Sequence, residues 1–349
     1  MARETVQGAA DRSERLLLSS PVLETLLARR DLGLDAGTAS DLIMTVASEL
    51  CSTREPDGCW QGSACRTAEY LLLLHELADG SDALDELARP SVEWLRRRIT
   101  KASGAPVPAG EAVPICTPLL HEIGLCAHRS PCLIGVVPAR VDLAGLRLLN
   151  GSGVISDVDG RVAVSALAVA ALLSWGGAMR ELGHHVGELA RITLLEDRQR
   201  MRVLSTNGMA CVALALLAAE AATSADGAGA GARPGASPAA GAGIAHARDA
   251  APASAVDRGV AVLVRTQRGD GSWPTADLFF VLSVLVRAAA VRRHAIAVDP
   301  ALRRSASQLA LLQQRDGGWS RDGGTWSLLV GWRVLRAATA TRPEPLTVR

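Results

Sequence analysis

Two short segments near the C-terminal end of the chain are almost copies of each other, and a third segment is a weaker copy. Residues 267–273 read QRGDGSW, and residues 313–319, 46 positions later, read QQRDGGW. Residues 54–60 read REPDGCW. Each copy lies between apolar runs with helical spacing, so the repeated unit reads as a helix, an Asp-Gly turn and a second helix. Such repeats constrain the chain to a fold built from repeated helical units.

Each residue type in the repeat has a predicted role in the turn. The Asp-Gly pair favours a tight turn, because Gly accepts a positive φ without strain. The Trp is predicted to pack over the turn and to find a partner for its indole N–H. The Gln, at a helix C-terminus, is predicted to hydrogen-bond the carbonyls that the helix leaves unpaired.

Helical spacing of apolar residues extends through the chain, and no segment shows the alternation that predicts a strand. The sequence therefore predicts an all-α fold, with as many helical runs as a toroid of paired helices, an α/α barrel, would need. Whether these runs form one toroid or a shortened two-lobe version stays open. The predicted helices span residues 11–30, 38–51, 63–78, 82–101, 115–127, 160–175, 178–193, 207–222, 255–267, 275–295, 299–314 and 325–339.

Two regions are expected along the chain. Residues 1–140 form a helical region with the weak DGxW repeat, and residues 141–349 form the barrel region with the two stronger repeats. Within the second region, residues 224–254 are almost entirely Ala, Gly and Pro with a few charges. Such a segment buries too little apolar surface to offset its ordering entropy, so we expect a flexible insert there.

Composition limits the partners and the compartment. The 37 basic and 36 acidic residues balance, so nothing indicates a nucleic-acid partner. The seven cysteines form no CxxC pair, which favours a reducing compartment. The longest apolar runs, residues 162–175 and 209–219, are too short to span a bilayer. We therefore expect a cytoplasmic protein without a transmembrane segment.

An acidic motif opens one of the most apolar helical runs. Asp157-Val-Asp159-Gly160 comes directly before the run that starts near Arg161. The carboxylates of Asp157 and Asp159 can cap the helix, where their charge suits the positive end of the helix dipole.

Four motifs occur in an order that resembles the class II terpene cyclases, the group of copalyl diphosphate synthases and, more distantly, squalene–hopene cyclases. Asp157-Val-Asp159 is similar to the first two acids of that family's Asp-x-Asp-Asp or Asp-x-Asp-Thr-Thr motif, and Ser205-Thr206-Asn207 to its Ser-Thr-Asn segment. The segment 267–273, followed by Phe279-Phe280, is similar to its Gln-x-x-Asp-Gly-Ser-Trp repeat with a downstream Tyr pair. The segment 313–319 resembles the last such repeat, so the resemblance covers most of residues 150–340.

The resemblance implies an α/α toroid of the terpenoid cyclase and prenyltransferase type, and it implies an activity. Class II cyclases are isomerases that protonate a terminal alkene of a linear isoprenoid diphosphate, such as geranylgeranyl or farnesyl diphosphate. The carbocation then closes into rings while the diphosphate is retained. Asp159 would be the general acid and Asp157 its neighbour. Mg²⁺ is expected because the diphosphate must be charge-compensated.

The chemistry requires a buried, neutral carboxyl group and aromatic faces that stabilise a carbocation. Arg161 would lower the pKa of Asp159 and oppose proton donation if its side chain pointed toward the acid. It can instead point away or contact the diphosphate. The residues expected to bind substrate are Asn207, Trp273, Phe279, Phe280, Trp319 and Arg161.

Other interpretations remain open. Gly160 and Arg161 replace residues of the family's acid motif, as in a catalytically inactive homologue, and helical repeats also serve as binding scaffolds. Protein prenyltransferase β-subunits share the toroid and bind zinc through an Asp, a Cys and a later His. Asp57 and Cys59 have the Asp-x-Cys form, but no His follows His294. A loose group of possible metal ligands has spacings that match no structural zinc site: Cys116, His121, Cys126, His128 and Cys132.

Overall fold

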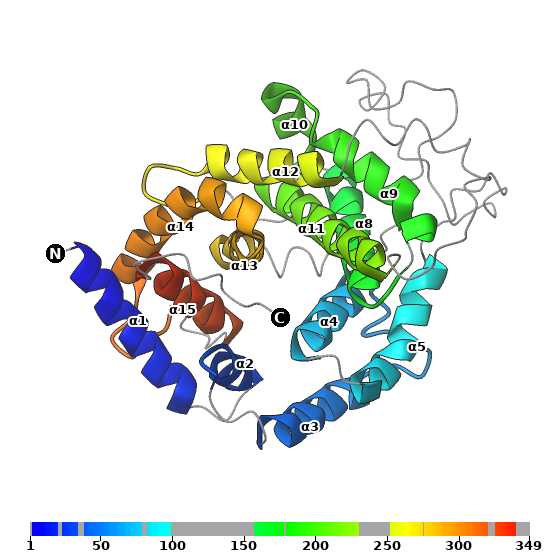
Figure 1. Cartoon of the computed structure of the whole chain (residues 1–349), viewed down its shortest axis with the longest axis horizontal. Coiled ribbons are helices and arrows are strands. Elements are labelled where there is room, and N and C mark those ends of the chain that lie inside the picture. Colours follow the sequence, from blue (N-terminus) through cyan, green and yellow to red (C-terminus); the bar gives the residue numbers. More distant parts are fainter. Residues whose placement is uncertain are drawn as a thin grey trace. The chain divides into compact units, whose positions relative to one another are not determined.

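The computed structural model describes residues 2–19, 23–33, 38–78, 82–98, 157–177, 179–229, 252–274, 276–319 and 325–339. Within these ranges every helix or strand assigned is an α-helix, which confirms the all-α prediction (Figure 1). The helices are α1 (Ala2–Ser19), α2 (Leu23–Asp31), α3 (Thr38–Ser52), α4 (Ala64–Leu77), α5 (Asp82–Arg98), α8 (Asp157–Ser174), α9 (Met179–Ile192), α10 (Asp197–Val203), α11 (Thr206–Gly229), α12 (Pro252–Thr266), α13 (Leu278–Ala290), α14 (Arg292–Leu312) and α15 (Thr325–Thr339).

Some predicted boundaries were wrong. The run predicted as 11–30 is two helices, α1 and α2, and Pro21, which fixes φ and lacks an N–H donor, lies between them in the sequence. α10 was not predicted as a helix. α11 continues to Gly229 and α12 begins at Pro252, so helices take in both ends of the predicted insert. Residues 230–251 and the predicted helix 115–127 lie outside the described residues.

The chain folds as two compact units, each built from separate stretches of sequence. Unit 1 consists of residues 1–53, 76–87 and 260–349, and unit 2 consists of residues 54–75 and 88–259. This division differs from the predicted boundary at residue 140. The reason is that α1 packs against α14 and α15, from the far end of the chain.

The core of unit 2 forms where α8 packs on α11, with α9 against both. Every side chain from Val162 to Leu173 is buried, as expected for a helix that is apolar on all sides. Within the described residues, one stretch is long and apolar enough to cross a membrane by composition, Thr206–Ser224 of α11. It is 72% buried inside the protein, as in the core helix of a folded domain.

In each of the two stronger repeats, the Gln side chain links the turn to the next helix but one. After α12, Gln267 donates its amide N–H groups to the Ala301 carbonyl oxygen (3.0 Å) and the Ser305 hydroxyl (2.8 Å), both on α14. After α14, Gln313 makes the same pair of contacts with Ala9 (3.0 Å) and Ser13 (2.7 Å) of α1. The prediction that the Gln pairs with carbonyls at the end of its own helix was therefore wrong, because the Gln side chain binds the next helix but one.

The Trp of the motif binds the helix end instead. Trp273 donates its indole N–H to the carbonyl oxygen of Leu263 (2.7 Å), and Trp319 donates to that of Leu309 (2.7 Å). Both carbonyls belong to the last turn of the preceding helix, where no backbone N–H within the helix is available. The prediction of a partner for the indole N–H is confirmed.

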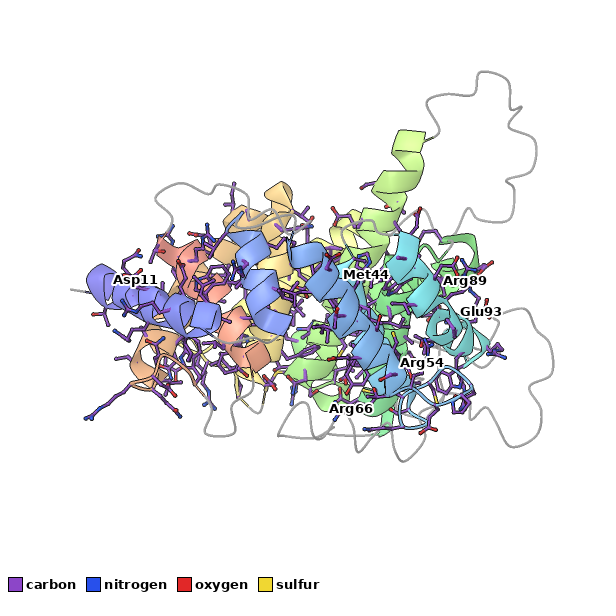
Figure 2. All side chains as sticks on the ribbon, turned by 90° about the horizontal axis from the view of Figure 1, so that it is seen from below. Asp11, Met44, Arg54, Arg66, Arg89 and Glu93 are labelled. Atoms are coloured by element: carbon purple, nitrogen blue, oxygen red, sulfur yellow. The ribbon has the colours of Figure 1, made fainter. Side chains whose placement is uncertain are left out.

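The third copy of the motif uses an Arg where the others have Gln. Arg54, labelled in Figure 2, donates to the hydroxyl of Ser91 on α5 at 3.4 Å. Asp57 closes the turn by accepting from the backbone N–H of Cys59 (3.1 Å), and its other oxygen accepts from the Trp94 indole (2.9 Å). The weak sequence copy therefore forms the same kind of joint.

Candidate active site

Asp159 lies in the first turn of α8 and is completely buried, with 0% of its surface exposed. Its Oδ1 accepts two hydrogen bonds from Ser205, one from the backbone N–H and one from the hydroxyl, both at 3.1 Å. The Ser205 hydroxyl in turn accepts from the backbone N–H of Gly208 at 2.9 Å. The carboxyl group thus binds the residue that caps α11 and does not serve only as a cap of its own helix.

The start of α11 is shaped to admit this carboxyl group. A Cβ on Gly208 would collide with Oδ1 of Asp159, so a larger residue would displace the acid. Asn207, next to it, is 1% exposed. Two motifs that are 46 residues apart in sequence therefore meet at one buried point in unit 2.

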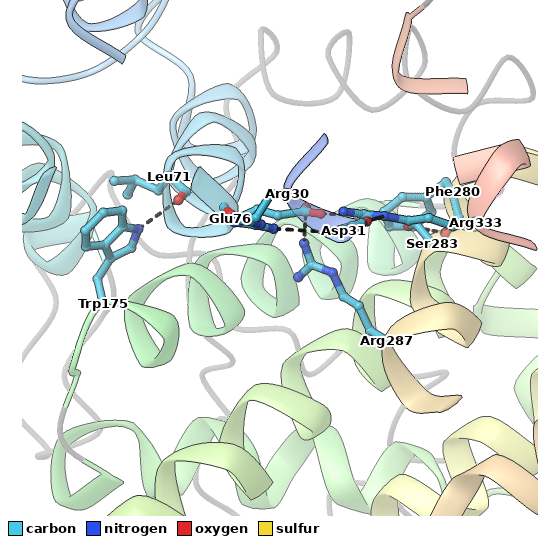
Figure 3. Close-up of polar contacts among 9 residues, drawn as sticks. All are labelled: Arg30, Asp31, Leu71, Glu76, Trp175, Phe280, Ser283, Arg287 and Arg333. Carbon is cyan, nitrogen blue, oxygen red and sulfur yellow. Dashed lines mark hydrogen bonds and ion pairs between the residues drawn. The ribbon is translucent and has the colours of Figure 1, made fainter. Parts of the chain in front are cut away.

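A second acid that the sequence analysis missed, Glu69, acts on the same thiol as Asp159. The thiol of Cys211, one helical turn beyond Asn207, is influenced by the charges of both Asp159 and Glu69. Burial raises the pKa of Cys211 well above its usual value, and these two carboxylates raise it further. The helices that carry the two acids are joined where the Trp175 indole, just after α8, donates to the Leu71 carbonyl oxygen of α4 (2.8 Å; Figure 3).

Glu69 is a half-buried carboxylate in an otherwise apolar part of α4. Its side chain is 17% exposed, and it forms an ion pair with Arg66 at 2.9 Å. Burial raises the pKa of Glu69 to about 7, because desolvation outweighs the opposing effect of Arg66. The sequence signal for this site is a single Glu within the otherwise uncharged run Ala68–Leu74.

The other predicted site residues are distributed over both units. Trp273 is buried and Trp319 is half-buried, and both indoles are occupied in the repeated turns. Phe279 contacts Trp319, with ring centroids 5.9 Å apart. Asp277 caps α13 by accepting from the backbone N–H of Phe280 (3.0 Å), and this fixes the start of the helix that carries both Phe residues.

The side chains of two predicted residues lie outside the described part of the structure, although Asp157 and Arg161 both belong to α8. The four aromatic residues belong to unit 1, whereas Asp159 and Asn207 belong to unit 2. The roles assigned to these six residues and to Asp157 and Arg161 stay predictions.

The geometry around Asp57 and Cys59 opposes a zinc site. Both carboxylate oxygens of Asp57 accept hydrogen bonds, one from the backbone N–H of Cys59 in the turn and one from the Trp94 indole on α5. Burial raises the pKa of Cys59 to about 11, helped by its hydrogen bond with Asp57, so the thiolate that zinc needs is disfavoured. Among the described residues, no three His, Cys, Asp or Glu side chains gather as a metal site would require. The ligand group between Cys116 and Cys132 lies outside those residues.

No protein-family model matches the chain, and no curated protein matches it significantly. Among solved structures, a crystal structure of a protein from Actinoplanes is similar to the chain, with a TM-score of 0.46 and 17% sequence identity. That alignment covers 95% of this chain and 99% of the other. The function must therefore be inferred from the geometry of the site.

Proposed function

We propose that the protein is a class II terpene cyclase, which converts a linear isoprenoid diphosphate into a cyclic diphosphate by protonating its terminal alkene. The observation that carries the proposal is the complete burial of Asp159 and its hydrogen bonds to the Ser205 of the Ser-Thr-Asn segment. Two motifs that resemble those of one enzyme family contact each other directly, although they are far apart in sequence.

The geometry of Asp159 suits a proton donor. An alkene is a very weak base, so the acid must be kept from water, and burial favours the neutral form of a carboxyl group. Both hydrogen bonds from Ser205 reach Oδ1 and hold the carboxyl group in one orientation. In the reaction the carboxyl O–H bond of Asp159 breaks, a C–H bond forms at the alkene, and the resulting cation is attacked by the next double bond. Loss of a proton from the last cation restores the balance, so the product is an isomer of the substrate.

The toroidal architecture is part of the proposal. The turns after α12 and α14 dock on the next helix but one, namely α14 and α1, and the turn after α3 docks on α5. Joints between alternate helices are what an outer layer of a barrel of paired helices requires. Mg²⁺ is proposed as a companion of the diphosphate, and no described residue group is assigned to it.

A purely structural role for Asp159 is the competing interpretation, because an ionised carboxylate would hold Ser205 equally well. It predicts a stable scaffold or an inactive homologue, and it differs from the cyclase in one measurable respect. In a structural role, Asp159→Asn changes stability, whereas in catalysis it changes turnover.

The test is incubation with geranylgeranyl or farnesyl diphosphate and Mg²⁺, followed by dephosphorylation and mass analysis. Wild type should form a cyclic product, and Asp159→Asn should lower the rate by at least about 10³-fold with a similar melting temperature. Asp299→Asn, at an exposed ion pair of α14, is the matched control and should retain activity. Undiminished turnover by Asp159→Asn would exclude the mechanism.

A further inference from the structure

Unit 1 contains a group of charged side chains that the proposed reaction does not use. Figure 3 shows this arginine cluster, which consists of Arg30, Asp31, Glu76, Arg287 and Arg333. The residues come from α2, from the C-terminal end of α4, and from α13 and α15. Glu76 and Arg333 are the most buried members, with side chains 3% and 7% exposed.

The two carboxylates are held by all three arginines. Glu76 pairs through Oε1 with Arg333 and through Oε2 with Arg287 (3.0 Å). Asp31 accepts from Nε of Arg333 at 2.7 Å, and the carbonyl oxygen of Glu76 accepts from Arg30. Burial alone would raise the pKa of Glu76, but Arg287 and Arg333 outweigh it and hold the pKa below its ordinary value. Glu76 is therefore charged at neutral pH.

The three arginines carry more N–H donors and more charge than the two carboxylates pair with. Within the described residues, Nη2 of Arg333 is buried without a hydrogen-bond partner. Nη2 of Arg30 also makes no hydrogen bond, although it forms an ion pair with Oδ1 of Asp31 at 3.8 Å. Three guanidinium groups face two carboxylates, so one positive charge is not compensated within the cluster. Native structures pair nearly all of their buried donors, so donors left over in a buried cluster call for an explanation.

We propose that the arginine cluster binds the oxyanions of a diphosphate group. A guanidinium group presents its N–H donors as a planar fork that matches phosphoryl oxygens, and the Nη2 atoms of Arg333 and Arg30, which make no hydrogen bond, provide such donors. Arg287 and Arg30 form the edge of the cluster that meets solvent, with side chains 25% and 18% exposed, whereas the Nη2 atoms of Arg30 and Arg333 lie beneath that edge. Arg336 adds another positive charge beside Asp31, whose carbonyl oxygen accepts from it at 3.4 Å.

The surroundings of the cluster suit an anion that carries an apolar chain. Phe280, Ser283 and Arg287 are spaced three and four residues apart on α13, so they share one face of the helix (Figure 3). Phe280 lies about 10 Å along the helix from Arg287, at 1.5 Å per residue. The assignment of the apolar chain to an isoprenoid rests on the proposed function, whereas the assignment of the anion rests on the cluster alone.

The binding test uses inorganic diphosphate, titrated by calorimetry at low salt without Mg²⁺. Wild type should bind, Arg287→Gln should bind at least tenfold more weakly, and Glu76→Gln should bind several-fold more tightly because it removes one negative charge. Arg303→Gln removes an exposed arginine of α14 and should bind like wild type. Circular dichroism shows whether each variant is folded. Absence of binding to wild type at millimolar diphosphate, or equal affinity in Arg287→Gln, overturns the proposal.

A second measurement separates this inference from the proposed function. Farnesyl diphosphate should bind at least tenfold more tightly than inorganic diphosphate, and equal affinities would overturn the apolar-chain assignment. If wild type forms a cyclic product but Arg287→Gln binds inorganic diphosphate as tightly as wild type, the anion site is wrong and the cyclase stands. If wild type binds inorganic diphosphate in the predicted order of variants but forms no cyclic product, the cyclase is wrong and the anion site stands.

Discussion

At the scale of single residues, the most informative position is Asp159, because three independent constraints converge on it. It is buried, it accepts from both donors of Ser205, and Gly208 leaves room for its carboxylate. Fixing a side chain in this way is costly for a structural purpose alone, since exposed acids such as Asp82 suit the start of a helix without it. Preorganisation of a reacting group requires such constraints.

Glu69 gives a prediction on pH. Its pKa in the folded protein is raised from 4.5 to about 7, so its contribution to stability is fully present below pH 4.5 and is lost as the pH rises through 7. The shift of 7 − 4.5 corresponds to about 3 kcal/mol at 1.36 kcal/mol per pKa unit. Urea unfolding at pH 5 and pH 8 should therefore show a loss of stability in wild type that is much smaller in Glu69→Gln.

The matched control for Glu69 is Glu93→Gln, a change at an exposed position on α5, which should keep the pH dependence of wild type. An identical loss of stability in wild type and Glu69→Gln would contradict the assignment. The same experiment shows whether unit 2 holds a protonated carboxyl group near Cys211 at neutral pH.

At the scale of elements, each repeated turn depends on a Gly that touches the next helix but one. Gly271 has φ +89°, and a Cβ there would lie 2.5 Å from the carbonyl oxygen of Arg304. Gly317 repeats this arrangement against Arg12, and Gly58 against Pro90. Each turn thus fixes the distance between two helices as well as the direction of the chain.

The turn supplies a pair of variants two positions apart. Gly271→Ala should lower the free energy of unfolding by about 2 kcal/mol or more, from the left-handed backbone and the collision with α14. A Cβ at Gly269 would have no atom within 4 Å, so Gly269→Ala should change the free energy of unfolding by less than about 0.5 kcal/mol. Chemical unfolding followed by Trp fluorescence measures both, and equal effects would show that the turn is not a joint between helices.

The sequence predicted the helices well because their apolar periodicity is local information. It predicted the Trp contacts of the turns for the same reason, whereas the partners of Gln267 and Gln313 lie on helices that no local pattern connects. Spacing alone did not predict the contact between Asp159 and Ser205 either, although the resemblance named both segments. Glu69 was missed because its raised pKa depends on burial, which a sequence does not show.

At the scale of the whole molecule, α1 completes unit 1 by binding helices from the other end of the chain. Gln313 contacts Ala9 and Ser13, and the indole of Trp332 donates to Glu14 at 3.1 Å. These contacts join residues at least 300 positions apart, and the two partners in the Trp332–Glu14 bond are separated by 318. Unit 1 is therefore a non-local assembly.

Deleting residues 2–19 should expose this dependence. Hydrogen exchange followed by mass spectrometry should show lost protection in α14 and α15, the helices that α1 covers, and little change in α8 and α11 of unit 2. Gln313→Ala should produce a smaller loss in α14 and α15. Unchanged exchange in α15 after the deletion would mean that the contacts of α1 add no stability there.

The separation in sequence between α1 and its partner helices also affects folding during protein synthesis. At about 5–20 residues per second, translation delivers the 301 residues between Arg12 and Gln313 in roughly 15–60 s. During that interval the newly synthesised α1 lacks the helices on which it packs. Its apolar side chains, including Leu17, which is fully buried in the folded protein, therefore stay exposed to solvent. Slower expression or chaperones that shield an emerging amphipathic segment should thus raise the yield of folded protein.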